Sequence, residues 1–122
     1  MLAFGPQAYE LDKTKIASAP QRMVRSLFRD NDGPACYELG TGGPRGGNIQ
    51  WHYVGETSNE RNRMTRYGQD GSHLSEIIRW HLKKGWHLYY RAWACRTKAE
   101  AKKMQDNLLA KHKYDWNRML NS

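Results

Sequence analysis

The sequence has few cysteines, no long apolar run and no opening segment that resembles a signal peptide. Two cysteines, Cys36 and Cys95, are too few for a disulfide framework and too far apart for a zinc knuckle, so we expect both to be reduced and packed. No apolar run approaches the ~18 residues of a membrane span. The opening MLAFGPQAYELDK lacks a basic segment followed by an apolar one. We therefore expect a cytoplasmic protein without membrane segments.

Acidic residues are also scarce relative to basic ones. The chain has 20 Lys and Arg against 12 Asp and Glu, a net charge of +8 and a pI near 9.7. Seven Tyr and five Trp accompany these cations. This composition favours a polyanionic partner. Nucleic acid is favoured over an acidic membrane because no segment combines a basic face with a large apolar face.

Hydrophobic periodicity and turn residues divide the chain into elements. The first 17 residues show little period and are expected to form an irregular arm. Ser18 and Gln21 form a capping box for a helix that ends at DNDGP. Its arginine stripe comprises Arg22, Arg25 and Arg29. Strands at 35–39 and 49–55 form a hairpin around a glycine-rich loop that carries Arg45; this loop lacks the lysine and hydroxyl ending of a P-loop.

Two helices, a strand and a last helix follow the hairpin. Thr57 and Ser72 are expected to cap the two helices, and Gly85 ends the second. Residues 86–95 are typical of a third strand. The capping box TKAE opens the last helix over 99–112.

These elements predict one compact α+β domain with no internal repeat. At 122 residues the chain is long enough for a modest core. We expect a small three-stranded antiparallel sheet flanked by helices, formed by residues 35–122, with an N-terminal arm and helix in residues 1–34.

Several residues in this domain form a spaced pattern. Tyr37 ends ACY in the first hairpin strand, and Tyr53 and Gly55 belong to YVG in the second. Arg63 follows Tyr53 by ten residues, and Arg63 and Tyr67 are four apart on one helix face. The combination resembles the GIY-YIG nuclease family, although ACY departs from glycine-isoleucine-tyrosine at two positions.

Two later segments extend this resemblance. SHLSEIIRWHLKKG is similar to the next helix of GIY-YIG homing endonucleases, with His73 matching a histidine there. QDNLLAKHKYDWN resembles the closing element of the family, in which an acidic residue precedes an asparagine by twelve positions. That asparagine is Asn117, and the acidic position is occupied by Gln105. In the family this acidic residue is a glutamate that binds a single divalent metal.

The resemblance implies a DNA endonuclease that hydrolyses phosphodiester bonds with Mg²⁺ or Mn²⁺. Arg63 would contact the scissile phosphate, and Tyr37 or Tyr53 would deprotonate water if positive charge lowered its pKa. Asn117 would hold the site together. Tyr67 and His73 are candidate acid, base or phosphate contacts, and Gly55 is expected at a structural turn. The arginines expected to contact DNA are Arg22, Arg25, Arg29, Arg45, Arg61 and Arg66.

Gln105 distinguishes this chain from that pattern. It lies on the expected apolar face of the last helix, with Ala101, Met104, Leu108 and Leu109. A neutral amide is a poor ligand for Mg²⁺, so we expect weakened metal binding and impaired cleavage. Glu100 is the alternative ligand, but it serves as the capping-box acid and stands five positions early. A deliberate glutamate-to-glutamine change explains Gln105 most simply, and a naturally inactive relative is the alternative.

Two other functions are compatible with parts of the sequence. A DNA-binding module of the same fold without catalysis is the rival hypothesis, and an RNA-binding domain has only charge and aromatic content in its favour. The sequence leaves the oligomeric state open, a dimer included. The tryptophans are expected in the core or at its rim more than as base-stacking platforms: Trp51, Trp80, Trp86, Trp93 and Trp116.

Overall fold

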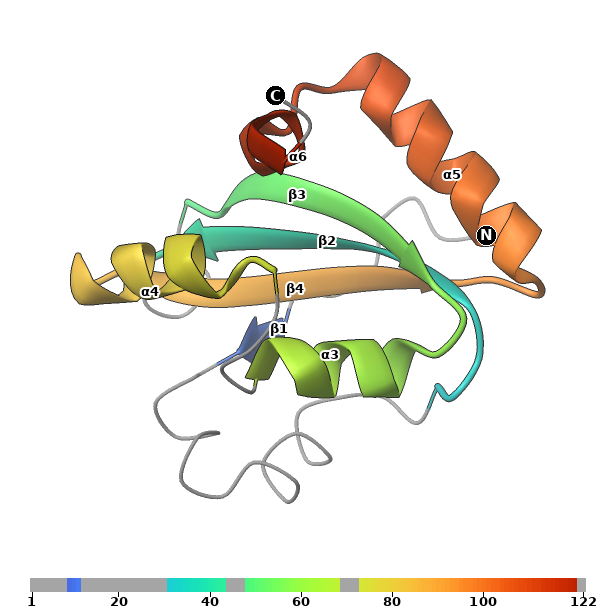
Figure 1. Ribbon diagram of the computed structural model, residues 1–122, viewed down its shortest axis with the longest axis horizontal. Helices are drawn as coiled ribbons and strands as arrows, with labels where there is room; N and C mark the ends of the chain where they lie inside the picture. The colour runs from blue at the N-terminus through green and yellow to red at the C-terminus, as the bar shows by residue number, and fades with distance from the viewer. Residues whose placement is uncertain (1–8, 12–30, 44–47, 69–72, 121–122) are drawn as a thin grey trace.

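The computed structural model describes residues 9–11, 31–43, 48–68 and 73–120 (Figure 1). In chain order the elements are β1 (Tyr9–Leu11), β2 (Ala35–Gly42), β3 (Gln50–Thr57), α3 (Glu60–Gly68), α4 (Ser75–Lys83), β4 (His87–Ala94), α5 (Lys98–Lys111) and α6 (Asp115–Leu120). Within these described ranges no helix combines the length and the apolar character needed to cross a membrane. The helix expected after Ser18 lies outside the described residues.

The strands form one antiparallel sheet in the order β1-β4-β2-β3. The predicted α+β class, with helices flanking an antiparallel sheet of the three predicted strands, is confirmed. The short strand β1 is an addition, because it lies in the segment expected to be an irregular arm and pairs with β4. Three residues are too few to show a strand period in sequence, so only pairing with β4 reveals this strand.

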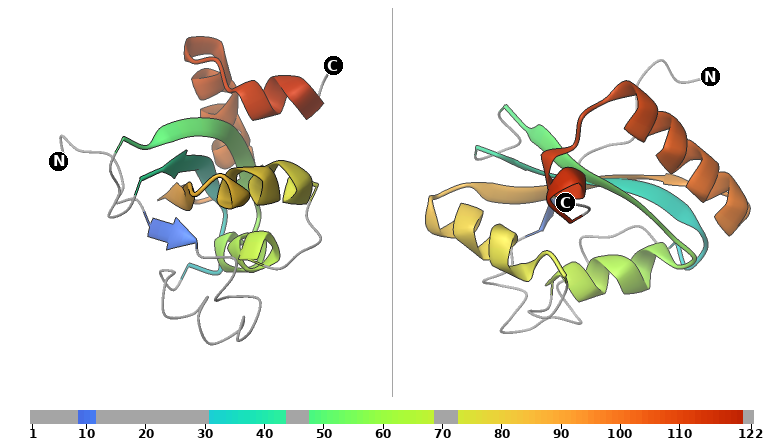
Figure 2. Two further views of the ribbon diagram at one scale, coloured as in Figure 1. Left: turned by 90° about the vertical axis from the view of Figure 1, so that its left-hand side faces the viewer. Right: turned by 45° about the horizontal axis from the view of Figure 1, so that its top comes forward.

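Helices pack on both faces of the sheet (Figures 1 and 2). Alternate residues of β2 point to opposite faces. Tyr37 and Leu39 join the main core with residues of α3 and α4, whereas Cys36 joins a smaller cluster with Val54 and residues of α5. The main core and the α5 cluster are therefore separated by the sheet.

The short helix α6 packs against the edge strand β3, and the residues at its start contribute to both clusters. Tyr114, just before α6, packs in the α5 cluster, and Trp116 packs in the main core. No pattern in the sequence indicates this helix. Six residues are too short for a helical hydrophobic stripe, and its stability comes from packing against the sheet.

Two helix starts differ from the expected ones. Asn59, not Thr57, caps α3, because its Oδ1 accepts the backbone N–H of Asn62 at 3.0 Å. The Thr57 hydroxyl instead accepts the N–H of Asn59 at 3.1 Å, so it forms the turn before the helix. The helix α4 begins at Ser75 after an N-cap at Leu74 that has no side-chain cap, and Ser72, the expected cap, lies outside the described residues.

The end of α4 and the start of α5 agree with the sequence. Gly85 has φ +92°, a left-handed conformation suited to glycine, directly after the C-cap of α4. Thr97 caps α5 by accepting the N–H of Glu100 at 3.1 Å. Ala101 is fully buried as expected, but Leu109 is 39% exposed and does not belong to the buried face.

Candidate functional site

Tyr37 lies at the centre of a group of polar aromatic residues on the α3 side of the sheet. Its side chain is fully buried, and its hydroxyl lies 2.7 Å from the hydroxyl of Tyr67 on α3. Arg63, one turn earlier on α3, donates from Nη1 to the same Tyr37 oxygen at 3.2 Å. The spacing of four residues expected to place Arg63 and Tyr67 on one helix face does so here.

Tyr53 and His73 complete this group. Tyr53 on β3 is partly buried, with its ring centroid 6.2 Å from that of Tyr37. Its hydroxyl lies 3.3 Å from Nε2 of His73, which precedes α4 and is exposed. We call Tyr37, Tyr53, Arg63, Tyr67 and His73 the tyrosine cluster. Five of the predicted site residues therefore gather in one place, and Tyr53 and His73 lie on its solvent side.

Gly55 makes room for this cluster and does not form the expected turn. It lies within β3, opposite Tyr37 in the register of the sheet. A Cβ atom at Gly55 would lie 2.5 Å from the Tyr37 hydroxyl oxygen, 2.6 Å from its Cζ and 3.0 Å from a ring carbon of Tyr53. The absence of a side chain therefore lets the Tyr37 ring lie across the neighbouring strand.

The segment before β2 anchors the helix that carries Arg63 and Tyr67. The first N–H groups of a helix have no partner inside it. In α3 the N–H of Glu60 binds the Gly33 carbonyl at 3.0 Å, and the N–H of Arg61 binds the Asn31 carbonyl at 3.1 Å. The Asn31 amide also donates to the Glu60 carboxylate at 2.8 Å. These bonds fix α3 against the strand that carries Tyr37.

Burial controls the protonation of the tyrosine cluster. Desolvation raises the pKa of Tyr37 to about 12, with the neighbouring Tyr53 adding to the shift and Arg63 opposing it. Burial likewise raises the pKa of Tyr67 far above its ordinary value and that of Tyr53 to a smaller extent. Burial and the charge of Arg63 lower the pKa of His73 below 6.5. At neutral pH the cluster thus holds three protonated phenols, a neutral imidazole and the Arg63 cation.

This arrangement suits the binding of an anion. Arg63 is the cation of the cluster, and a guanidinium can present paired N–H donors to phosphate. The Tyr53 hydroxyl is a donor that solvent can reach. Tyr37 is fully buried, so its hydroxyl can orient Arg63 but cannot contact a nucleophilic water. The condition set for a tyrosine base, a pKa lowered by positive charge, is not met by either tyrosine.

Asn117 lies next to this site but on the outer edge of the sheet. Its Oδ1 accepts the backbone N–H of Val54 at 2.8 Å, and its Nδ2 donates to the Val54 carbonyl at 2.9 Å. The side-chain amide thus pairs with the free edge of β3 as another strand would. Asn117 thereby holds the backbone of Val54, which lies between Tyr53 and Gly55 on β3.

A second contact between α6 and β3 involves His52, and the sequence patterns did not predict it. Its Nδ1 lies 2.8 Å from an oxygen of Asp115, and its Nε2 lies 2.9 Å from the Thr41 hydroxyl. The His52 ring also stacks on Trp116, with centroids 4.7 Å apart. No spacing signal links residues 63 positions apart, so only the tertiary structure reveals this contact.

Gln105 lies on α5, on the opposite face of the sheet from the tyrosine cluster (Figure 1). It is partly buried, and among the described residues its side-chain amide has no hydrogen-bond partner. Within the described residues, no hydrogen bond therefore links Gln105 to the tyrosine cluster.

The donor atoms around Gln105 do not suit a divalent metal. In the described ranges no group of three His, Cys, Asp or Glu residues could hold one. On the α5 side of the sheet, Glu38 is buried with its two oxygens bound to Arg91 and Tyr114. Glu56 binds Lys98 through Oε1 at 3.2 Å, and its buried Oε2 has no hydrogen-bond partner among the described residues. A hard cation prefers several charged oxygen ligands, and of the four oxygens of Glu38 and Glu56 only this one is without a partner.

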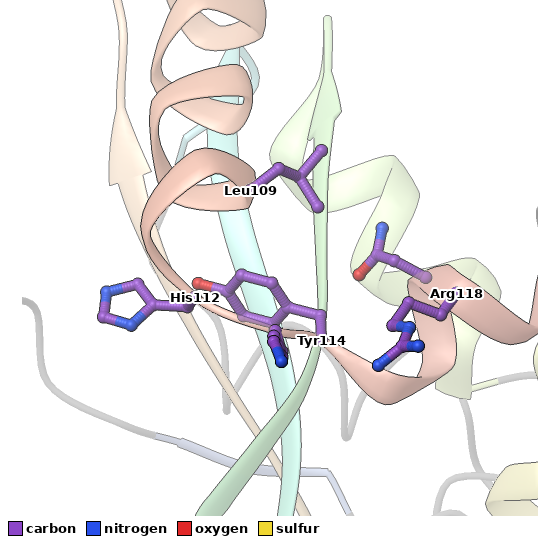
Figure 3. Close-up of a pocket in the computed structure, with 6 residues that line it drawn as sticks. Leu109, His112, Tyr114 and Arg118 are labelled. Carbon is purple, nitrogen blue, oxygen red and sulfur yellow. The ribbon is translucent and has the colours of Figure 1, made fainter.

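An open pocket of about 390 Å³ lies at the corner where α5 turns into α6 (Figure 3). Its lining contains two cations and a histidine but no acidic residue: Leu109, His112, Lys113, Tyr114, Asn117 and Arg118. Leu109 is one helical turn beyond Gln105. Figure 3 shows Leu109, Tyr114 and Arg118 around this corner. The corner therefore presents positive charge beside Asn117.

The arginines expected to contact DNA have different environments. Arg61 is partly buried and lies 3.4 Å from the Asp32 carboxylate, so part of its charge is neutralised by the protein. Arg66 is exposed on α3. The remaining four lie outside the described residues: Arg22, Arg25, Arg29 and Arg45.

Comparison with known proteins identifies the sequence pattern at the level of a family. The family model for GIY-YIG domain-containing proteins matches residues 4–81 and 75–122, which together span nearly the whole chain. Comparison with the curated proteins and with the solved structures gave no match.

Proposed function

This chain belongs to the GIY-YIG family, and on that premise we propose that it is a DNA-binding domain of endonuclease type whose metal-dependent cleavage is impaired by Gln105. GIY-YIG nucleases act on DNA and generally use divalent metals. The observation that carries the proposal is the contact of Arg63 with the Tyr37–Tyr67 hydroxyl pair beside the exposed Tyr53–His73 pair.

In this proposal Arg63 and Tyr53 contact the scissile phosphate. Tyr37 accepts a hydrogen bond from Arg63 and so orients the guanidinium, while Tyr67 holds the Tyr37 hydroxyl. Tyr53 keeps its proton at neutral pH because burial raises its pKa, so it acts as a donor to a phosphate oxygen. The neutral His73 imidazole at 3.3 Å orients that hydroxyl.

The net charge of +8 supports DNA as the partner. Exposed cations extend beyond the tyrosine cluster to Arg66 on α3 and to Lys113 and Arg118 at the α5–α6 corner. These side chains would contact phosphates without reading sequence.

Metal chemistry is where this chain departs from its family. A bound Mg²⁺ or Mn²⁺ would stabilise negative charge on the reacting phosphate. Gln105 offers a neutral carbonyl oxygen, and both oxygens of Glu38 are bound by Arg91 and Tyr114. Glu56 has one oxygen without a partner beside the one that contacts Lys98, so these residues offer too few charged oxygens for a divalent ion. A non-catalytic DNA-binding module is therefore the second candidate function, and the same donor set favours it.

A cleavage assay on the chain and on Gln105→Glu separates these functions. Asn107→Asp is the matched control, since it also adds one carboxylate to α5 but at an exposed position. Each protein is incubated with duplex and single-stranded DNA, with Mg²⁺, with Mn²⁺ and with EDTA, and binding is measured in parallel.

We expect all three proteins to bind DNA, and only Gln105→Glu to cut it efficiently and in a metal-dependent manner. Metal stabilisation worth several kcal/mol predicts a gain of several orders of magnitude. If Gln105→Glu binds but never cuts, the non-catalytic module is the correct function. Efficient cleavage by the unaltered chain would show that the metal ligand is another residue, and Glu100 would be tested next.

A further inference from the structure

The five tryptophans, which the sequence does not distinguish, have different environments in the structure. Trp116 is buried in the main core. Trp51 and Trp93 are partly buried on either side of Arg91, whose guanidinium carbon lies 4.4 and 5.5 Å from their ring centroids. Trp80 and Trp86 are 56% and 46% exposed. Trp80 and Trp86 are therefore the two tryptophans whose ring surfaces a ligand can reach most readily.

Trp80 and Trp86 flank the turn from α4 to β4. The turn is closed by a hydrogen bond from the Trp86 N–H to the His81 carbonyl at 3.1 Å. Gly85 adopts its positive φ between the two tryptophans. Both indoles are therefore presented from a backbone held by the sheet and by α4, which limits the entropy lost when a ligand binds.

Lys83 and Lys84 lie between Trp80 and Trp86 in the chain, at the turn from α4 to β4. The Lys84 ammonium lies 5.3 Å from the centroid of the Trp80 ring, and Lys83 is exposed beside it. Neither lysine forms an ion pair with any residue that the structure describes. Glu76, one turn before Trp80, is the acidic side chain of α4. Aromatic faces beside unneutralised ammonium groups match a nucleotide, which combines a flat base with a negative phosphate.

The turn between α4 and β4 is close enough to the tyrosine cluster for one DNA strand to contact both. Trp80 follows His73 by seven residues, and α4 leads from the cluster toward the turn (Figure 1). Within α4, the five steps from Ser75 to Trp80 span about 8 Å at ~1.5 Å per helical residue, the length of roughly two stacked nucleotides. A strand that passed the start of α4 beside His73 would thus reach Trp80 within a few nucleotides.

We propose that Trp80 and Trp86, with Lys83 and Lys84, form a stacking platform for unpaired nucleotides next to the tyrosine cluster. This inference rests on the proposed function and narrows its substrate to DNA with a single-stranded segment beside the site. Bases within a duplex have both faces covered by their neighbours, so an indole can stack on them only where the strand is unpaired. A protein partner fits less well, because lysine is depleted at the centre of protein interfaces.

Fluorescence anisotropy tests the platform with three DNA probes: a blunt duplex, the same duplex with a single-stranded extension, and the extension strand alone. The variants are Trp80→Ala, Trp86→Ala and their combination, with Trp80→Phe as the conservative replacement. Lys84→Gln is paired with Lys103→Gln, which removes one exposed lysine from α5 on the other side of the sheet. Circular dichroism verifies that each variant is folded.

The unaltered chain should bind the extended duplex more tightly than the blunt one. Each alanine replacement should weaken binding to the two probes with unpaired nucleotides by roughly tenfold, and blunt-duplex binding by less than about twofold. Trp80→Phe should retain most of the affinity, and Lys84→Gln should lose more than Lys103→Gln.

Two results would overturn the platform while leaving the proposed function intact: equal binding of blunt and extended duplexes by the unaltered chain, or DNA affinities unaffected by both alanine replacements. The second result would point to a protein ligand for the indoles. Failure of the unaltered chain to bind any of the three probes would overturn the proposed function together with the platform.

Discussion

Replacing Asn117 with alanine removes both hydrogen bonds that its side-chain amide makes to the edge strand β3. The amide binds the N–H and the carbonyl of Val54 at 2.8 and 2.9 Å, and Asn117 is only 9% exposed. Alanine leaves these two backbone groups without their partner. An unpaired buried polar group costs about 1–3 kcal/mol.

Water can reach part of a sheet edge once a side chain is shortened, so the cost lies below the sum of two full penalties. We expect Asn117→Ala to lower the free energy of unfolding by about 2–4 kcal/mol. For a chain of 122 residues each kcal/mol corresponds to about 4 °C in Tm, so the melting temperature should fall by roughly 8–15 °C.

Urea unfolding followed by circular dichroism measures this loss. Asn107→Ala is the control, because Asn107 is exposed on α5 and its replacement should change the free energy of unfolding by less than about 0.5 kcal/mol. Asn117→Asp tests the pairing itself. Its carboxylate can still accept the Val54 N–H but repels the Val54 carbonyl, so this variant should regain stability at acidic pH, where a protonated carboxyl can donate.

A loss of less than about 0.5 kcal/mol for Asn117→Ala would refute the reasoning. A pH-independent deficit for Asn117→Asp would refute the specific role of the donated hydrogen bond. Either result would mean that packing of Trp116 and the His52–Asp115 contact hold α6 in place without the amide.

Two further outcomes concern the tyrosine cluster. Gly55→Ala should lower the free energy of unfolding by about 1–3 kcal/mol and weaken DNA binding, because the new methyl group would lie 2.5–2.6 Å from atoms of the rigid Tyr37 side chain. An unchanged free energy of unfolding in urea would contradict this packing. Since burial raises the folded-state pKa of Tyr37 from 10.0 to about 12, the unfolded chain releases this proton first, and stability should be lost as the pH rises from 10 to 12. Ultraviolet absorbance of tyrosinate should then appear together with unfolding for Tyr37 and Tyr67, and full ionisation of all tyrosines in the folded protein would disprove their burial.

Expectations about helix ends succeeded where neighbouring residues decide the structure and failed where distant segments decide it. The cap at Thr97 and the glycine that ends α4 depend on neighbouring residues, and both are confirmed. The cap expected at Thr57 used the same local signals but is wrong. In α3 the segment at Asn31 and Gly33 supplies acceptors from another part of the chain, and this contact sets where the helix begins.

The role expected for Gly55 illustrates the same limit. A glycine at the end of a β-rich run is typical of a turn, but β3 continues to Thr57. The reason for this glycine is the Tyr37 ring on the adjacent strand, and strand register decides which residues lie opposite each other.

By itself the sequence determined the α+β class, the three main strands and the pattern Tyr37, Tyr53, Arg63 and Tyr67, because strand and helix periods and motif spacing are local properties. Only the tertiary structure decided that Tyr37 is buried with a raised pKa, that Asn117 pairs with a strand edge, and that Trp80 and Trp86 are exposed whereas Trp116 is not. Burial, protonation and edge pairing depend on which distant segments meet. Those contacts follow from the packing of the whole chain and not from the identity of any one residue.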